Sequence, residues 1–297
     1  MGHDNDCRFR HCPFYTLKDL LRGKAKFSYV DGLMKVKTAL VTGGSKGIGK
    51  SICQKLLENG TTVYSISRSL GRGIGHPKYH ELQLDLSDIV AVKHFLAEFT
   101  SKYEIPDLLI NNAGYGAFFD WEKFPDQELV DQMQVLFTTP ALFCKKFAPL
   151  MSQRESGIIV NLSSLAVLYP LPFMPIYNSA KAALSSLTRS LVLEYNNSPK
   201  FIDFRMGDIK TAFNDSSIKQ SEFNNNRNMQ SAWNQIERQL HDSPGPDVAA
   251  HQILSAVYEG KGGTIYGGGF FQSRIAPIVY NFINSRLVNT ILSKRYF

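Results

Sequence analysis

The chain has 297 residues, with 33 lysines and arginines against 26 aspartates and glutamates, and a formal charge of +7. At 43% hydrophobic and 20% charged residues, its composition excludes a disordered chain, and its length suits one large α/β domain. No apolar run reaches the ~20 residues that span a bilayer, and the charged start lacks the apolar stretch of a secretory signal. Cys7, Cys12, Cys53 and Cys144 are too scattered for a disulfide framework, so we expect a reducing, cytoplasmic location.

The positive charge is concentrated at the two ends of the chain. Residues 1–35 carry seven bases and four acids, and residues 272–297 carry four bases and no acid. The intervening residues 36–271 hold 22 bases and 22 acids and are therefore neutral. Because nucleic-acid-binding proteins carry basic clusters on their folded body, we expect no nucleic-acid partner.

Short runs rich in β-forming residues alternate with helical patterns from Lys35 onward. We predict strands at Val36–Thr42, Thr62–Ser67, Tyr79–Leu84, Leu108–Asn111, Gly157–Leu162 and Lys200–Met206. Apolar residues at helical spacing predict helices between them, and a further helix is predicted at Asp247–Tyr258. This alternation is typical of βαβ units, so the sequence predicts an α/β fold with a Rossmann-like, doubly wound parallel sheet.

We divide the chain into an N-terminal extension at 1–34, a single Rossmann domain at 35–270 and a C-terminal amphipathic extension at 271–297. The first part holds two histidines and two cysteines, but their spacing matches no metal-ligand pattern. No metal site is therefore expected.

A glycine-rich segment, Thr42–Gly49, follows the first strand and opens the first helix. Glycines at such a turn let the backbone approach a pyrophosphate, although a tight connection without a ligand would have the same pattern. The second strand ends in Ser67 and Arg68, where NAD enzymes place an acid that holds the ribose. A guanidinium pairs with a 2′-phosphate, so Arg68 and Lys46 together favour NADPH/NADP, while two solvated surface bases remain the alternative.

Tyr177 and Lys181 lie four positions apart on a predicted helix and project from one face of it. Ser164 ends the preceding strand, thirteen positions before Tyr177. A Tyr–Lys pair alone is usually a surface feature. Together with Thr42–Gly49 and Asn111–Gly114, in this order and spacing, these residues resemble the short-chain dehydrogenase/reductase family over residues 36–266.

The resemblance implies a catalytic set of three residues. Tyr177 would give its phenolic proton to a substrate carbonyl, Ser164 would hydrogen-bond the same oxygen, and Lys181 would lower the phenol pKa and hold the nicotinamide ribose. Residues 212–240 would form a mobile substrate loop. The implied cofactor contacts are Gly43, Ser45, Lys46, Gly47, Ile48, Gly49, Arg68, Asp85, Leu86, Asn112, Ala113, Gly114, Tyr177, Lys181, Gly207, Ile209 and Thr211.

One position departs from the family pattern. Leu136 stands where the family has an asparagine that helps to hold a proton-relay water, and no asparagine occurs in residues 115–160. Gln132 or Gln134 could take its place only if the helix is locally distorted. We expect an NADPH-dependent reductase, and the alternative is a weakly active NADP(H)-binding sensor or scaffold.

Bulky apolar residues flank the expected site and favour a small hydrophobic carbonyl or alcohol substrate, such as a lipid, steroid or acyl derivative. They could equally cover the core or a subunit interface, and family members commonly form homodimers or homotetramers. These residues are Tyr115, Phe118, Phe119, Trp121 and Leu165–Phe173.

The C-terminal extension interleaves apolar and aromatic residues with four bases. Basic amphipathic helices of this kind lie in membrane interfaces, which favours peripheral contact with an intracellular membrane or a lipid droplet. The pattern also resembles the C-terminal extension of fungal 1-acyl-dihydroxyacetone-phosphate reductases, a lipid-metabolising branch of the family. The alternative is a helix that packs on the domain or on a dimer partner.

Overall fold

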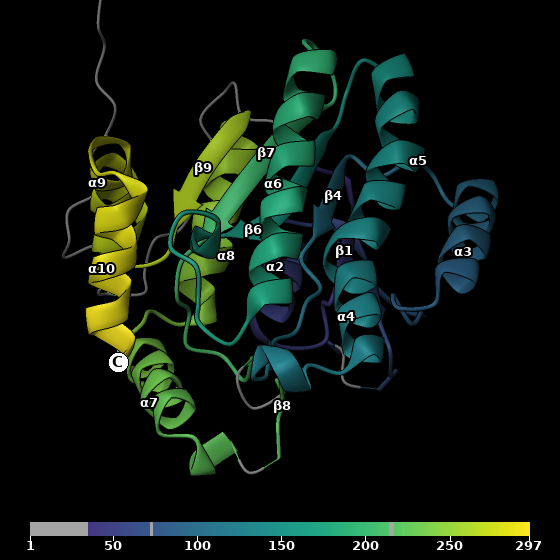
Figure 1. Ribbon diagram of the computed structural model, residues 1–297. Coiled ribbons are helices and arrows are strands. Elements are labelled where there is room, and N and C mark those ends of the chain that lie inside the picture. Colours follow the sequence, from purple (N-terminus) through teal and green to yellow (C-terminus); the bar gives the residue numbers. More distant parts are fainter. Residues whose placement is uncertain (1–34, 72–73, 214–216, 222) are drawn as a thin grey trace, which may run out of the picture. The chain divides into compact units, whose positions relative to one another are not determined.

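Seven parallel strands form the central sheet of the computed structural model, which describes residues 35–71, 74–213, 217–221 and 223–297 (Figure 1). The extension predicted at 1–34 lies outside these residues. The parallel pairing of every neighbouring pair confirms the predicted Rossmann-like α/β fold. In spatial order the strands are β3 (Tyr79–Gln83), β2 (Thr62–Ser67), β1 (Thr38–Thr42), β4 (Leu108–Asn111), β6 (Ile158–Ser164), β7 (Lys200–Met206) and β9 (Gly263–Gly267).

The inner strands form because they are mostly apolar and are covered on both faces. β4 reads Leu-Leu-Ile-Asn and β6 reads Ile-Ile-Val-Asn-Leu-Ser-Ser, and every residue of both strands is buried. Such runs are typical of parallel strands between two helical layers. β9 was not predicted, because Ile265 and Tyr266 stand between glycines and the strand depends on its pairing with β7.

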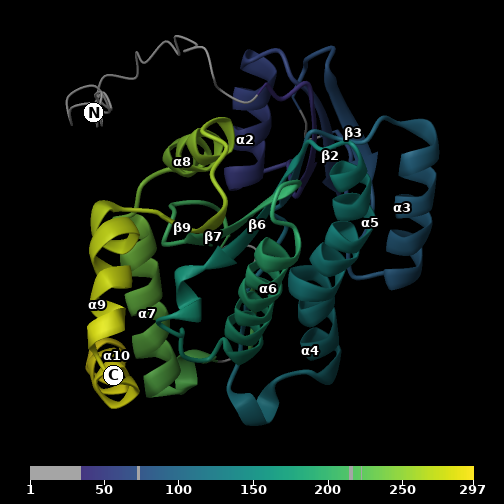
Figure 2. The same ribbon diagram turned by 90° about the horizontal axis from the view of Figure 1, so that it is seen from above.

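Helices cover both faces of the sheet (Figure 2). One layer consists of α2 (Gly47–Glu58) and α8 (Pro246–Tyr258), whose apolar residues pack together with those of the strands. The other layer contains α3 (Ile89–Lys102), α5 (Thr139–Gln153) and α6 (Pro175–Glu194). None of the helices in the described residues is long and apolar enough to cross a bilayer.

The order of the strands places a crevice at the carboxyl ends of β1 and β4. The chain runs outward from β1 through β2 to β3 and then returns to β4, on the other side of β1. Connections therefore leave these two strands in opposite directions, which opens the crevice in which doubly wound sheets bind ligands.

The segment predicted as a mobile loop at 212–240 contains a regular helix, so that prediction is wrong for α7 (Arg227–His241). Asn226 caps the helix by accepting hydrogen bonds from the backbone amides of Asn228 and Met229. α7 was not predicted because most of its residues are polar, yet it has an apolar stripe that is buried. The stripe consists of Met229, Ala232, Trp233 and Ile236.

The remaining short elements lie around the end of the sheet that carries the crevice or in the extension. The C-terminal extension lies beside α7 at the β9 end of the sheet (Figures 1 and 2). The short elements outside the extension are β5 (Ala117–Phe118) and β8 (Ile218–Lys219), which pair with each other, η1 (Trp121–Lys123), η3 (Leu165–Val167) and η4 (Phe223–Asn225). The extension contains η5 (Phe271–Ile275), α9 (Ala276–Phe282) and α10 (Ser285–Tyr296).

A buried ion pair lies on β7, directly beneath the expected catalytic residues. Asp203 is fully buried, and its carboxylate accepts hydrogen bonds from Arg205 Nε at 3.0 Å and Ser185 Oγ at 2.7 Å. Ser163, which precedes Ser164 on the adjacent strand, also donates to Asp203. Arg205 in turn donates to Ser185 and to the Tyr266 hydroxyl, at 2.9 and 3.1 Å. This network joins β6, β7, β9 and α6.

We expect Asp203→Asn to lower the free energy of unfolding by about 3–5 kcal/mol, because it leaves the Arg205 guanidinium buried without a counter-charge. Urea unfolding followed by circular dichroism measures the change. Glu98→Gln is the matched control, since Glu98 forms an exposed ion pair with Lys102 on α3 and its loss should have little effect. An equal effect of the two substitutions would contradict this account of the cluster.

Candidate active site

The glycine-rich loop between β1 and α2 is tied to the end of β4 by hydrogen bonds. Asn112 Nδ2 donates to the carbonyl oxygens of Thr42 at 2.9 Å and Gly43 at 3.3 Å. The Thr42 hydroxyl accepts from the backbone amides of Asn112 and Ala113, both at 3.0 Å. The two strand ends that border the crevice are therefore held in one arrangement.

Glycine is required at two positions of this loop by the closeness of the backbone. A side-chain Cβ at Gly49 would lie 2.2 Å from the carbonyl oxygen of Gly43 and 2.5 Å from Asn112 Nδ2. Gly43 has a φ of +72°, and a Cβ there would lie 2.9 Å from the Cα of Ala113. The bare backbone at the start of α2 fits the phosphates of a dinucleotide, which need this close approach.

The rest of the loop faces the segment after β7. A Cβ at Gly47, which has a φ of +53°, would lie 3.6 Å from the Thr211 side chain. Thr211 therefore lies against the loop, and its predicted contact with a cofactor stays a prediction. Ile48 and Ile209 instead pack into the core below, so only their backbone could face a cofactor.

The two bases proposed to select NADPH lie at the same end of the sheet. The side chains of Lys46, at the start of α2, and Arg68, after β2, are both exposed. The charge of Arg68 contributes to a lowered pKa of Asp85, whose main cause is the hydrogen bond from the Ser87 backbone amide. Leu86 is buried, and its carbonyl accepts a hydrogen bond from the hydroxyl of Thr139 at the start of α5, which holds this segment in place.

The structure brings Ser164, Tyr177 and Lys181 together, although they come from two different elements, β6 and α6. Ser164 ends β6, and its hydroxyl hydrogen-bonds the Tyr177 phenol on α6. Lys181 lies one turn further along α6, with Nζ 5.9 Å from the centre of the Tyr177 ring. The same Nζ donates to the carbonyl oxygen of Leu162 at 2.7 Å, which anchors the ammonium group to β6.

Burial shifts both titratable groups of this set. The protein around the phenol raises the pKa of Tyr177 by desolvation, the hydrogen bond from Ser164 opposes this, and the charge of Asp208 adds to it. Burial also lowers the pKa of Lys181, to about 8. Desolvation is the largest cause of the Tyr177 shift, and the expected lowering of the phenol pKa by Lys181 together with a bound oxidised nicotinamide stays a prediction. The Tyr177 phenol therefore holds its proton at neutral pH, as an unshifted phenol also would.

The helix that carries Leu136 is locally distorted, which is the condition under which a glutamine could replace the missing asparagine. Between α4 (Asp126–Met133) and α5, residues Gln134–Thr138 form one π-helical turn, η2. π-Turns leave part of the backbone without its usual helical partners and occur often at functional sites.

The surroundings of Leu136, Gln134 and Gln132 show whether either glutamine could take the place of the missing asparagine. Leu136 is buried against Gly114, where a Cβ would lie 2.9 Å from Leu136 Cδ2 and 3.9 Å from Lys181 Nζ. Gln134 is engaged elsewhere, because its amide donates to Thr139. Gln132 is fully buried; its amide donates to the Tyr115 carbonyl, and its Oε1 has no protein partner in the described part of the chain. Gln132 therefore offers a buried acceptor for a hydrogen bond.

An apolar cluster forms one wall beside the catalytic tyrosine. Tyr177 packs partly into this cluster, and its ring meets that of Phe213 edge-on at 5.9 Å. We call the buried members the apolar wall: Phe118, Met174, Met229, Ala232, Trp233, Ile236 and Tyr296. The wall thus combines residues of β5, α7 and the C-terminal extension.

Of the other residues suggested to line the site, Leu171 and Phe173 also pack against the apolar wall, and several others lie elsewhere. Phe119 belongs to a separate cluster with Phe124, and Trp121 is 59% exposed. The Tyr115 hydroxyl donates to Glu128, and Leu165 packs against Ala276 of α9. Among these candidates Phe118 is the buried residue that shares the cluster of Tyr177, which the sequence could not distinguish because the assignment depends on α7.

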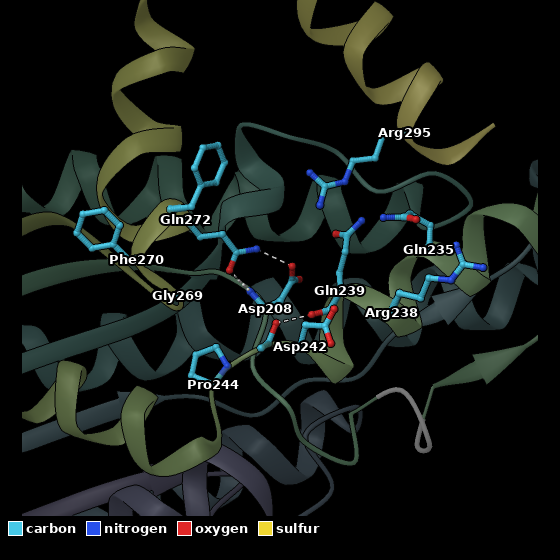
Figure 3. Close-up of a pocket in the computed structure, with 12 residues that line it drawn as sticks. Asp208, Gln235, Arg238, Gln239, Asp242, Pro244, Gly269, Phe270, Gln272 and Arg295 are labelled. Atoms are coloured by element: carbon cyan, nitrogen blue, oxygen red, sulfur yellow. Dashed lines mark hydrogen bonds between the residues drawn. The ribbon is translucent and has the colours of Figure 1, made fainter. Parts of the chain in front are cut away.

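Sequence analysis missed a polar contact between the segment after β7 and the C-terminal extension. Gln272 Oε1 accepts from the backbone amide of Asp208 at 2.9 Å, and Gln272 Nε2 donates to its carboxylate at 2.5 Å (Figure 3). A Cβ at Gly207 would lie 2.4 Å from Gln272 Oε1, so Gly207 is needed for this contact rather than for space around a cofactor. Burial raises the pKa of Asp208.

A cavity of about 510 Å³ lies beside this contact, between Asp208, α7 and the extension (Figure 3). Arg238, Arg295, Asp208 and Asp242 all line it, and Arg295 Nε lies 2.9 Å from the side-chain oxygen of Gln239. The charge of Asp208 acts on Tyr177, so the cavity has one lining residue near Tyr177, and no residue of the glycine-rich loop lines it.

The chain is similar in sequence to known dehydrogenases and reductases. The short chain dehydrogenase family matches residues 37–222. A 3-ketodihydrosphingosine reductase from Bacteroides thetaiotaomicron is 32% identical over 183 residues, which cover 61% of this chain and 67% of that enzyme. Alignments with three further oxidoreductases cover 54, 58 and 56% of their lengths, so the chain spans little more than half of those relatives.

Solved structures show the same fold at lower sequence identity. A short-chain dehydrogenase/reductase from Burkholderia phymatum in complex with NAD superimposes with a TM-score of 0.68 at 20% identity, covering 86% of this chain and 95% of that one. An alcohol dehydrogenase from Thermococcus sibiricus complexed with 5-hydroxy-NADP gives 0.64 at 21% identity, covering 80% and 97%. Proteins of this fold thus bind either dinucleotide.

We expect Gly49→Ala to abolish dinucleotide binding, because the added Cβ would displace the Gly43 carbonyl or Asn112. Fluorescence titration with NADPH measures this. Gly75→Ala is the control, since a Cβ at Gly75 meets no atom within 4 Å. Unchanged binding by Gly49→Ala, with its fold intact by circular dichroism, would show that the loop does not cradle the cofactor.

Proposed function

The chain belongs to the short-chain dehydrogenase family, and on this basis we propose that it is an NADPH-dependent reductase of hydrophobic carbonyl compounds. The observation that carries the proposal is the meeting of Ser164, Tyr177 and Lys181 at one point beside the glycine-rich loop. Three residues from β6 and α6 converge there with hydrogen-bonded hydroxyl groups and a buried ammonium group.

Each of the three residues has a distinct task in carbonyl reduction. The Tyr177 phenol, which is protonated at neutral pH, gives its proton to the carbonyl oxygen as negative charge develops there. The Ser164 hydroxyl hydrogen-bonds the same oxygen and stabilises that charge. Lys181 places a cation behind the phenol and stabilises the phenolate that remains. Bound NADPH supplies the hydride.

Lys46 and Arg68 support the choice of NADPH. They are exposed bases at the ends of the two elements that border the adenosine side of the crevice, and β2 ends without the acid that holds an NAD ribose. A 2′-phosphate would give both bases a partner of opposite charge.

A long apolar ketone is the substrate class that we favour. The apolar wall beside Tyr177 offers buried aromatic and aliphatic surface to such a chain, and the cavity at Asp208 offers polar groups to its other end. The similarity to a 3-ketodihydrosphingosine reductase, an enzyme named for a lipid ketone, supports the same class.

A second candidate function follows from Leu136. An apolar side chain next to Gly114 and Lys181 leaves no polar group there to help resupply protons, so turnover could be slow enough that cofactor binding itself is the function. Such a protein would act as an NADP(H) sensor or scaffold. Gln132, with its free Oε1, is the residue that favours the reductase over this alternative.

We expect Tyr177→Phe to reduce the turnover of NADPH with long-chain ketones by about 10²–10⁴-fold, because the proton donor is lost, while NADPH still binds. NADPH oxidation followed by absorbance measures the rate, and titration measures the binding. Tyr195→Phe makes the same chemical change at the other end of α6 and should leave the rate unchanged. If wild type and Tyr177→Phe were equally inert and both bound NADPH tightly, the sensor function would hold instead.

We expect Arg68→Ala to raise the KM for NADPH by about 10–100-fold and to change the KM for NADH little, because a charge-assisted contact with the 2′-phosphate is removed. Steady-state kinetics with both cofactors provide the test, and Arg189→Ala, which removes an exposed base from α6, is the control. Tighter binding of NADH than of NADPH by the wild type would overturn the assignment.

A further inference from the structure

The outer side of the C-terminal extension is unusually apolar. The described residues contain seventeen large hydrophobic side chains that are exposed, and eight of them lie within the extension. Exposed apolar residues scattered singly are ordinary, whereas a cluster of this kind marks an interaction surface. The eight are Phe271, Ile275, Ile278, Val279, Phe282, Leu287, Ile291 and Phe297.

Four of these residues form a continuous stripe along η5 and α9. Phe271, Ile275, Ile278 and Phe282 follow each other at intervals of four, three and four residues, which places them on one helical face. They are 58, 38, 60 and 84% exposed. The usual arrangement, in which the apolar face of a surface helix turns toward the core, is therefore reversed here.

The opposite side of α9 is attached to the domain by other residues. Ala276 is buried, and its carbonyl accepts a hydrogen bond from the Tyr169 hydroxyl at 2.8 Å. The Tyr280 ring meets the Tyr169 ring edge-on at 5.5 Å. These contacts hold the helix in place, so the stripe faces away from the domain as a consequence of packing.

α10 continues the same arrangement. Val288 and Tyr296 are buried, and Leu292 packs with Tyr296 against the apolar wall. Leu287 and Ile291, each one position before an inward-facing residue, are 46 and 48% exposed. One face of α10 thus completes the wall beside Tyr177, and another adds apolar residues to the outer surface.

The charges of the extension all have one sign. After Glu259 the chain contains no acidic side chain, while Arg274, Arg286, Lys294 and Arg295 are exposed. In a twofold interface between two copies, the same patch would meet itself and bring these bases together without counter-charges. A surface that carries negative charge would neutralise them.

We propose that this outer surface lies in the headgroup layer of a bilayer that contains anionic phospholipid. The stripe of Phe271, Ile275, Ile278 and Phe282 enters the boundary between headgroups and acyl chains, and the exposed bases other than Arg295 pair with lipid phosphates. Apolar insertion and attraction to anionic lipid together give stable peripheral binding where either alone is weak. The proposal goes beyond the reductase function and does not depend on it.

Vesicle co-sedimentation of the full chain tests the proposal, with phosphatidylcholine vesicles and with vesicles that also contain phosphatidylserine. We expect binding to the anionic vesicles that weakens as salt is raised. Ile278→Ser combined with Phe282→Ser should weaken it at least about tenfold, because two inserted side chains lose their apolar surface. Val90→Ser combined with Leu193→Ser, at residues that are 73 and 76% exposed outside the extension, should not change it.

Three results would overturn the proposal: no binding of the wild type, equal loss in both double variants, or a double variant of the stripe that changes the oligomeric state in light scattering while vesicle binding persists. The last result would assign the stripe to a second copy of the chain. Oxidation of NADPH with a water-soluble aldehyde, measured without vesicles, should be the same in wild type and the stripe variant. A failure of that assay in every variant would count against the reductase function alone.

Discussion

The close approach of Gly49 to the carbonyl oxygen of Gly43 is the contact on which the carboxyl edge of the sheet depends. It leaves no room for a side chain, and so it allows Asn112 to reach back to the Thr42 carbonyl at 2.9 Å. That hydrogen bond joins β4 to β1 across the crevice. Since Ser164 ends β6, the next strand after β4, strand pairing and the buttressing Asn112 side chain together set the distance between the glycine-rich loop and Ser164.

A second constraint comes from the C-terminal extension, on the other side of the site. Gln272 holds Asp208 through both atoms of its amide, and Asp208 influences the pKa of Tyr177. Tyr296 of the same extension is part of the apolar wall. The extension is thus part of the surroundings of Tyr177: its inner side contributes Tyr296 to the apolar wall, and its outer side carries a candidate lipid-binding surface.

The parts of this arrangement that follow from short stretches of sequence could be predicted. The strands at Thr62–Ser67, Leu108–Asn111 and Lys200–Met206 have their predicted bounds, and Ser164, Tyr177 and Lys181 meet as their spacing implied. α7 was missed because its polar residues outnumber its apolar stripe. Asp208 and Gln272 are sixty-four positions apart, and such a contact arises from the fold of the whole domain, with no local pattern to announce it.

The position of Tyr296 has a consequence for the order in which the protein is made. The sheet is complete once β9 has been synthesised, and the glycine-rich loop, Ser164 and Tyr177 are all present by then. The wall around Tyr177 still lacks Tyr296, which binds against residues as distant along the chain as Phe118. A nascent chain would therefore acquire a cofactor crevice before it has a closed substrate side, and premature release from the ribosome would leave apolar surface of α7 uncovered.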